Sequence, residues 1–86
     1  MKRIVLQINE FDLYQQILVF DDNDVIINGF KATMHELPLA VGRFAIEYDI
    51  NEICLQQSQY AKKIEERIKR TDVEKYISNN LIFKYI

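Results

Sequence analysis

The stretch from Met34 to Tyr60 constrains the fold of this chain most, because its apolar residues change period within one short segment. Five of them recur at the spacing of one helical face: Leu37, Val41, Phe44, Ala45 and Tyr48. Asp49-Ile50-Asn51 interrupts this period, and Ile53-Cys54-Leu55 is typical of a short apolar strand. Ser58 then stands where it can cap a second helix. The stretch therefore predicts a helix, a sharp turn and a strand, followed by another helix.

The residues before this stretch have the patterns of three strands, at 3–9, 13–20 and 25–30. Asp21-Asp22-Asn23-Asp24 separates the last two and predicts a hairpin turn, because Asp and Asn tolerate left-handed backbone and bond their own main chain. A calcium loop is the alternative interpretation of these acids. It is disfavoured because such a loop needs a central glycine and a distal glutamate.

The residues after it repeat the same alternation of helix and strand. Tyr60, Ala61, Ile64 and Ile68 form the apolar stripe expected of a second helix. The capping box at 71–74 indicates a break near Arg70 and a short third helical turn. Asn79-Asn80 favours the end of a helix, and the apolar pattern of residues 81–86 predicts a final strand.

These elements predict one α/β domain over residues 1–86, with the order β-β-β-α-β-α-β. Right-handed crossovers give a mixed five-stranded sheet ordered 3-2-1-4-5, in which only the second strand runs antiparallel to the others. Both crossovers then move the same way across the sheet. We therefore expect the two helices on one face and an open face on the other side.

This order resembles the ribonuclease H-like fold, which is shared by many nucleases, resolvases and actin-like ATPases. The resemblance covers nearly the whole chain but lacks the last helix of that fold. Nucleases of this fold hold two metal ions with carboxylates on the first strand, in the first helix and after the fourth strand. Here the two strand positions carry Gln7 and Asn9, and Gln56-Gln57, while Glu36 and Glu47 stand near or in the helix. Neutral amides bind Mg²⁺ poorly, so we expect no catalytic residue, metal or cofactor.

Composition indicates the cellular environment in which we expect this protein. A single cysteine, Cys54, excludes an intramolecular disulfide and fits a reducing cytoplasm. No apolar run approaches the roughly 20 residues of a membrane span. The high content of Ile, Lys and Asn resembles small proteins of phages and low-GC bacteria. The net charge of −2 divides into −5 over residues 1–57 and +3 over residues 58–86.

The positive charge collects on the second predicted helix, whose cations are Lys62, Lys63, Arg67, Lys69 and Arg70. A solvated helical face is one interpretation of this basic patch, and a phosphate-binding surface is the other. No aromatic residues interleave with these cations, so base recognition is not indicated. His35, the only histidine, is expected in a solvent-facing turn, and Cys54 is expected as a buried, inert thiol.

The final strand and the open sheet face are the remaining candidate surfaces. The final strand offers a candidate interaction edge that is nearly all apolar: Leu81, Ile82, Phe83, Tyr85 and Ile86. Alternation along the strands places Gln7, Cys54 and Gln56 on the open face, with Gln15 or Gln16 beside them. Our leading hypothesis is a non-enzymatic protein-interaction module, a homodimer or a partner of another protein. A nucleic-acid accessory protein and a degenerate nuclease or hydrolase are the alternatives.

Overall fold

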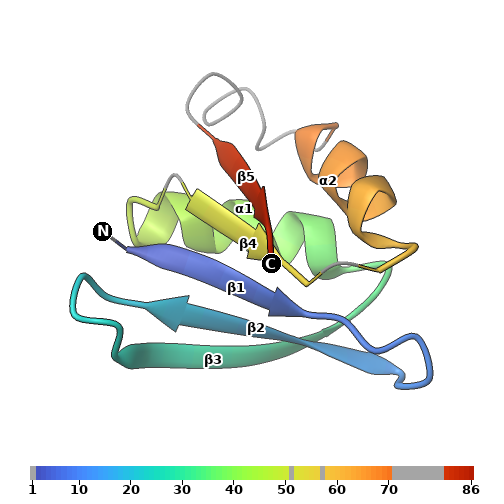
Figure 1. Cartoon of the computed structure of the whole chain (residues 1–86), viewed down its shortest axis with the longest axis horizontal. Coiled ribbons are helices and arrows are strands. Elements are labelled where there is room, and N and C mark those ends of the chain that lie inside the picture. Colours follow the sequence, from blue (N-terminus) through green and yellow to red (C-terminus); the bar gives the residue numbers. More distant parts are fainter. Residues whose placement is uncertain (1, 51, 57, 71–80) are drawn as a thin grey trace.

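A computed structural model describes residues 2–50, 52–56, 58–70 and 81–86 of the chain. The elements are β1 (Arg3–Gln7), β2 (Tyr14–Phe20), β3 (Ile26–Thr33), α1 (Leu37–Glu47), β4 (Glu52–Leu55), α2 (Ala61–Lys69) and β5 (Ile82–Tyr85) (Figure 1). The predicted α/β class and the order β-β-β-α-β-α-β are confirmed. The helical turn expected at 71–74 and the stop at 79–80 lie outside the described residues.

The five strands form one mixed sheet ordered β3-β2-β1-β4-β5, as the crossover rule predicts. β2 pairs antiparallel with β1 and with β3, whereas β4 pairs parallel with β1 and β5 pairs parallel with β4. This sheet order with two helices is consistent with ribonuclease H-like topology. β3 and β5 are the two edge strands of the sheet (Figure 1).

One hydrophobic core lies between a single sheet face and the two helices. The sheet contributes a layer of almost fully buried aliphatic side chains: Ile4, Leu6, Ile17, Val19, Ile53 and Leu55. The helices contribute Leu37, Val41, Ala45, Ala61, Ile64 and Ile68 to the same cluster. Each fully buried large aliphatic side chain stabilises the fold by about 1.5–3 kcal/mol. Both helices therefore pack on one face of the sheet, and no helix of the described chain covers the other face.

Local side-chain hydrogen bonds set the turns between these elements. The Asp21 carboxylate accepts the backbone N–H groups of Asn23 and Val25 at 2.8 and 3.0 Å, and Asp24 adopts a left-handed φ of 61°. This is the hairpin turn that the sequence predicts. After α1, Asp49 adopts a left-handed φ of 54°, and a backbone bond closes the turn, in which the Ile50 N–H donates to the carbonyl of Ala45 at 2.8 Å.

Several element boundaries differ from the prediction; β1, for example, ends at Gln7 instead of residue 9. β3 continues to Thr33 instead of ending at Phe30, because its pairing with β2 carries on to Tyr14. α2 has Tyr60 as its N-cap rather than Ser58, whose hydroxyl instead accepts the Tyr60 N–H at 3.2 Å in the preceding turn. In the described part of the chain, no helix is long and apolar enough to cross a membrane.

Candidate functional site

The β5 edge divides into exposed and inward-facing residues. Ile82, Tyr85 and Ile86 expose 50%, 41% and 62% of their surface. Leu81 and Phe83 are half-buried and pack against the core. Of the five predicted edge residues, the structure therefore leaves three exposed at the end of the sheet and directs two inward.

The single charge of β5 is engaged by the neighbouring strand. The Nζ atom of Lys84 lies 3.0 Å from Oε1 of Glu52, its diagonal neighbour on β4. Charged side chains on edge strands oppose the addition of another strand. Because Lys84 is drawn toward β4, this protection is weakened where β5 faces outward.

The backbone direction of β5 follows from its pairing with β4. The N–H of Ile86 donates to the carbonyl of Leu55 at 2.9 Å. Alternate residues of a strand direct their N–H groups to opposite sides, so Lys84 and Ile82 also face β4. The N–H groups of Phe83 and Tyr85 consequently point away from the sheet and are the donors that an added strand would use.

The opposite edge, β3, is better protected. Its pairing with β2 shifts register between Val19 and Phe20, which is a β-bulge beside Ile27. Bulges twist an edge away from regular pairing, and an exposed lysine at an edge opposes it further. β3 carries such a lysine at Lys31, although Ile26 and Ile27 are exposed near the bulge.

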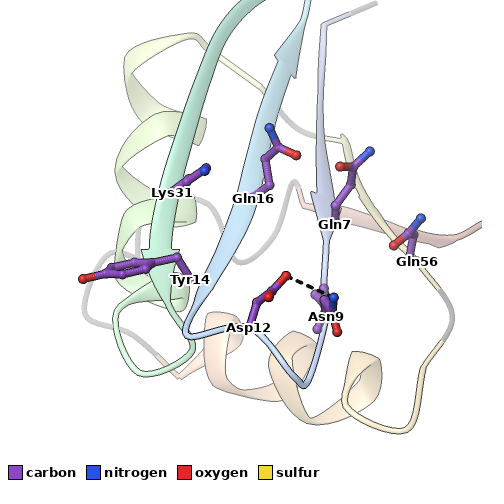
Figure 2. A pocket seen from close by; sticks show the side chains of 8 residues that line it. Gln7, Asn9, Asp12, Tyr14, Gln16, Lys31 and Gln56 are labelled. Carbon is purple, nitrogen blue, oxygen red and sulfur yellow. Dashed lines mark hydrogen bonds between the residues drawn. The ribbon is translucent and has the colours of Figure 1, made fainter.

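A transverse row of polar side chains crosses the open sheet face. Gln7 pairs in register with Gln16, and Gln16 pairs with Lys31. Gln56 follows Leu55, the register partner of Leu6, and so extends the row onto the chain after β4. Figure 2 shows these four side chains side by side on four neighbouring segments. They line a depression of about 410 Å³. We call Lys31, Gln16, Gln7 and Gln56 the amide row.

The side chains of the amide row are not used by the fold. Among the described residues, none of the four makes a side-chain hydrogen bond or ion pair. Sequence alternation places Gln7 and Gln56 on this face, and the structure shows both exposed there. Lys31 was missed, because only the β2–β3 register brings it into line with Gln16.

Gln15 and Gln16 have opposite roles. Gln15 is buried on the helix side, where its amide donates to the carbonyls of Asn9 and Asp12, both at 2.9 Å. Its carbonyl oxygen accepts the N–H of Asn9 at 2.5 Å. Asn9 also donates through its side chain to the Asp12 carboxylate at 3.0 Å, as the dashed line in Figure 2 marks. These bonds hold the β1–β2 loop that borders the amide row.

Cys54 is the buried thiol that the sequence predicts, although its position in β4 belongs to the predicted open face. It is on that face of β4 by alternation, but only 5% of it is exposed. Its register partners are Val5 and Lys84, and its Sγ lies 3.8 Å from Oε1 of Glu52. Burial raises the pKa of the Cys54 thiol, and the Glu52 carboxylate raises it further. Cys54 is thus a buried, protonated thiol and not a contact residue.

The basic patch lies on the outer side of α2. Lys62, Lys63, Lys69 and Arg70 are exposed, whereas Arg67 is half-buried. The ammonium of Lys69 lies 3.9 Å from the Glu65 carboxylate and 5.2 Å from the centre of the Phe83 ring. Tyr85 donates its hydroxyl to Glu65 at 3.0 Å, so α2 is fastened along the inner side of β5. Burial and this carboxylate raise the pKa of the Tyr85 phenol.

The positions that carry carboxylates in ribonuclease H-like nucleases are not joined into an acidic centre. Gln7 and Gln56 stand at the strand positions, and Glu36 accepts the hydroxyl of Thr33 at 2.7 Å in the turn before α1. His35 is exposed in that same turn. Within the described residues, no three His, Cys, Asp or Glu side chains gather as metal ligands. A scan of protein-family models and a search of curated proteins find no match to this chain.

Proposed function

We propose that this protein is a non-enzymatic interaction module that forms a homodimer through the outer edge of β5. Two copies of β5 pair antiparallel about a two-fold axis, which extends the sheet from one protomer into the other. The outward N–H groups of Phe83 and Tyr85 supply the new hydrogen bonds. An isologous contact of this kind is the commonest route to a closed dimer.

The observation that carries this proposal is the pairing of Lys84 with Glu52 next to exposed Ile82 and Ile86. The β5 edge combines apolar side chains, backbone N–H groups that point outward and one charged side chain that is paired with the neighbouring strand. An edge with these properties is a ready template for another strand. Because β5 is only four residues long, the contact is small, and we expect a dimer of micromolar affinity.

The two-fold arrangement also brings the α2 helices together. Each α2 is fastened along β5 through Glu65 and Lys69, and both helix layers lie on the same face of the extended sheet. Residues 61–70 hold five Lys or Arg against two Glu. Like charges therefore flank the seam, which weakens the dimer at low ionic strength.

Nucleic-acid binding by the basic patch is the second candidate. The exposed cations Lys62, Lys63 and Arg70 support it. It ranks lower because Lys69 is engaged by Glu65 and the Phe83 ring, and because phosphate binding draws on several free cations. A gel-shift assay with Lys62→Glu/Arg67→Glu as the comparison separates the two candidates.

Sedimentation equilibrium over a micromolar concentration series tests the proposed function. The expected result is a monomer–dimer equilibrium for the natural chain. A single monomeric species across the series would contradict the proposal.

A further inference from the structure

We infer that the open sheet face binds a neutral oligosaccharide along the amide row. This inference is independent of dimerisation through β5, because the row crosses β3, β2, β1 and the chain after β4. It begins from the observation that three primary amides and one ammonium group point into one depression without partners in the described chain. In Figure 2 their polar tips lie on the same side of the sheet.

The charge of this face favours a neutral ligand. The cations at its other corners are already paired: Arg3 with Asp24, and Lys84 with Glu52. The guanidinium of Arg3 also lies 4.6 Å from the centre of the Phe20 ring. The lining of the depression includes one cation, Lys31, and one anion, Asp12, which do not pair with each other, so the lining carries no surplus positive charge. A phosphate backbone needs a surplus of free cations, which this face does not provide.

The chemistry of the row suits hydroxyl groups. A primary amide offers both donors and an acceptor, and a hydroxyl group does the same. Each glutamine of the row can therefore donate a hydrogen bond to a sugar hydroxyl or accept one from it. Lys31 can only donate, and the Asp12 carboxylate can only accept. Neighbouring strands lie about 4.7–4.9 Å apart, so successive amides are separated by close to the length of one pyranose ring.

Tyr14 and the shape of the depression also support the binding of an oligosaccharide. Tyr14 lies two residues before Gln16 on the same face of β2, is exposed, and lines the depression. An exposed aromatic ring offers an apolar surface to the C–H face of a sugar, and its hydroxyl offers a further polar contact. A depression of about 410 Å³ falls within the range of small-ligand sites. Because it is open on the sheet surface, we expect weak binding, with a Kd on the order of 1 mM.

An NMR titration of the ¹⁵N-labelled chain tests this inference. The probes are maltohexaose, cellohexaose and chitohexaose, with a single-stranded uridine dodecamer as the charged comparison. At least one neutral hexasaccharide should shift the side-chain amide signals of Gln7, Gln16 and Gln56. Millimolar concentrations of all three sugars without such shifts, or shifts caused by the RNA alone, would overturn the inference.

Two variants test whether the sugar binds at the amide row or elsewhere on the protein surface. Gln7→Ala/Gln16→Ala should weaken binding of the active hexasaccharide at least tenfold. Gln59→Ala is the matched control, because Gln59 is an exposed amide outside the row that bonds Glu10 at 2.8 Å. It should leave the affinity unchanged. Equal affinity for the natural chain and the double variant would contradict a site on the amide row.

Discussion

The Nζ atom of Lys84 lies 3.0 Å from Oε1 of Glu52 on the neighbouring strand, so the only charged side chain of β5 is drawn toward β4. The same Glu52 oxygen lies 3.8 Å from the Sγ of Cys54. One half-buried carboxylate thus positions both the lysine beside the free edge and the thiol beneath it. The proposed dimer depends on this arrangement, because a lysine directed over the edge would oppose pairing.

Replacing Glu52 with Gln should therefore weaken dimerisation. Without the carboxylate, Lys84 keeps its charge but is no longer drawn toward β4. We expect the dimer Kd to rise by up to about fivefold, which corresponds to ~1 kcal/mol. Sedimentation equilibrium measures this change. Glu47→Gln removes the same charge from the exposed end of α1 and should leave the Kd unchanged. An equal effect of both variants would show that the net charge of the protein, and not the position of Lys84, determines the dimer affinity.

Added salt should strengthen the dimer. In the proposed dimer two basic α2 helices would lie beside each other, and screening would reduce their repulsion. Raising the ionic strength from about 0.01 M to 0.15 M shortens the Debye length from about 30 Å to 8 Å, and the Kd should fall across this range. Binding of nucleic acid through α2 would respond in the opposite direction. A dimer that dissociates as salt is added would contradict the proposed seam.

Gln15→Ala should destabilise the fold, because it removes hydrogen bonds from a buried side chain to partly buried backbone groups of the β1–β2 loop. Gln15 satisfies the N–H and carbonyl of Asn9 and the carbonyl of Asp12. We expect a loss of about 2 kcal/mol in the free energy of unfolding, measured by urea denaturation. Gln16→Ala, one residue along the same strand, should stay within about 0.5 kcal/mol of the natural chain. Similar losses for the two variants would contradict the separate roles of these glutamines.

Stability should decline at alkaline pH in a way that depends on Cys54. Burial raises the thiol pKa in the folded state, so the folded chain keeps a proton that the unfolded chain releases above its pKa of about 8.5. The unfolded state then binds fewer protons, and the free energy of unfolding falls as the pH rises above this value. Urea denaturation between about pH 7 and pH 10 measures the slope. The slope should be smaller in Cys54→Ala; an unchanged slope would assign the decline to other groups such as Tyr85.

The sheet order could be predicted because each local pattern had one consistent solution. Alternation at Ile4 and Leu6, the helical stripe from Leu37 to Tyr48 and right-handed crossovers leave little freedom in how the strands assemble. The burial of Ile53 and Leu55 against that stripe follows from the same rules.

The details of the two candidate surfaces could not be predicted, because they depend on register. Composition does not tell whether Gln15 or Gln16 faces outward, and only the alignment of β3 with β2 brings Lys31 beside Gln16. The burial of Cys54 was predicted, but the contact of its thiol with Glu52, which in turn pairs with Lys84, could not be. The outward N–H groups of Phe83 and Tyr85 likewise follow from the bond between Ile86 and Leu55.

Sedimentation velocity of Tyr85→Pro and Tyr85→Ala tests the central claim most directly. Both variants lose the phenol and its bond to Glu65, but only proline also removes the outward N–H and fixes φ. Circular dichroism first establishes that both are folded. Dimerisation through the β5 backbone predicts that Tyr85→Ala remains a dimer at micromolar concentration and that Tyr85→Pro sediments as a monomer. A Tyr85→Pro chain that dimerises as well as Tyr85→Ala would contradict it.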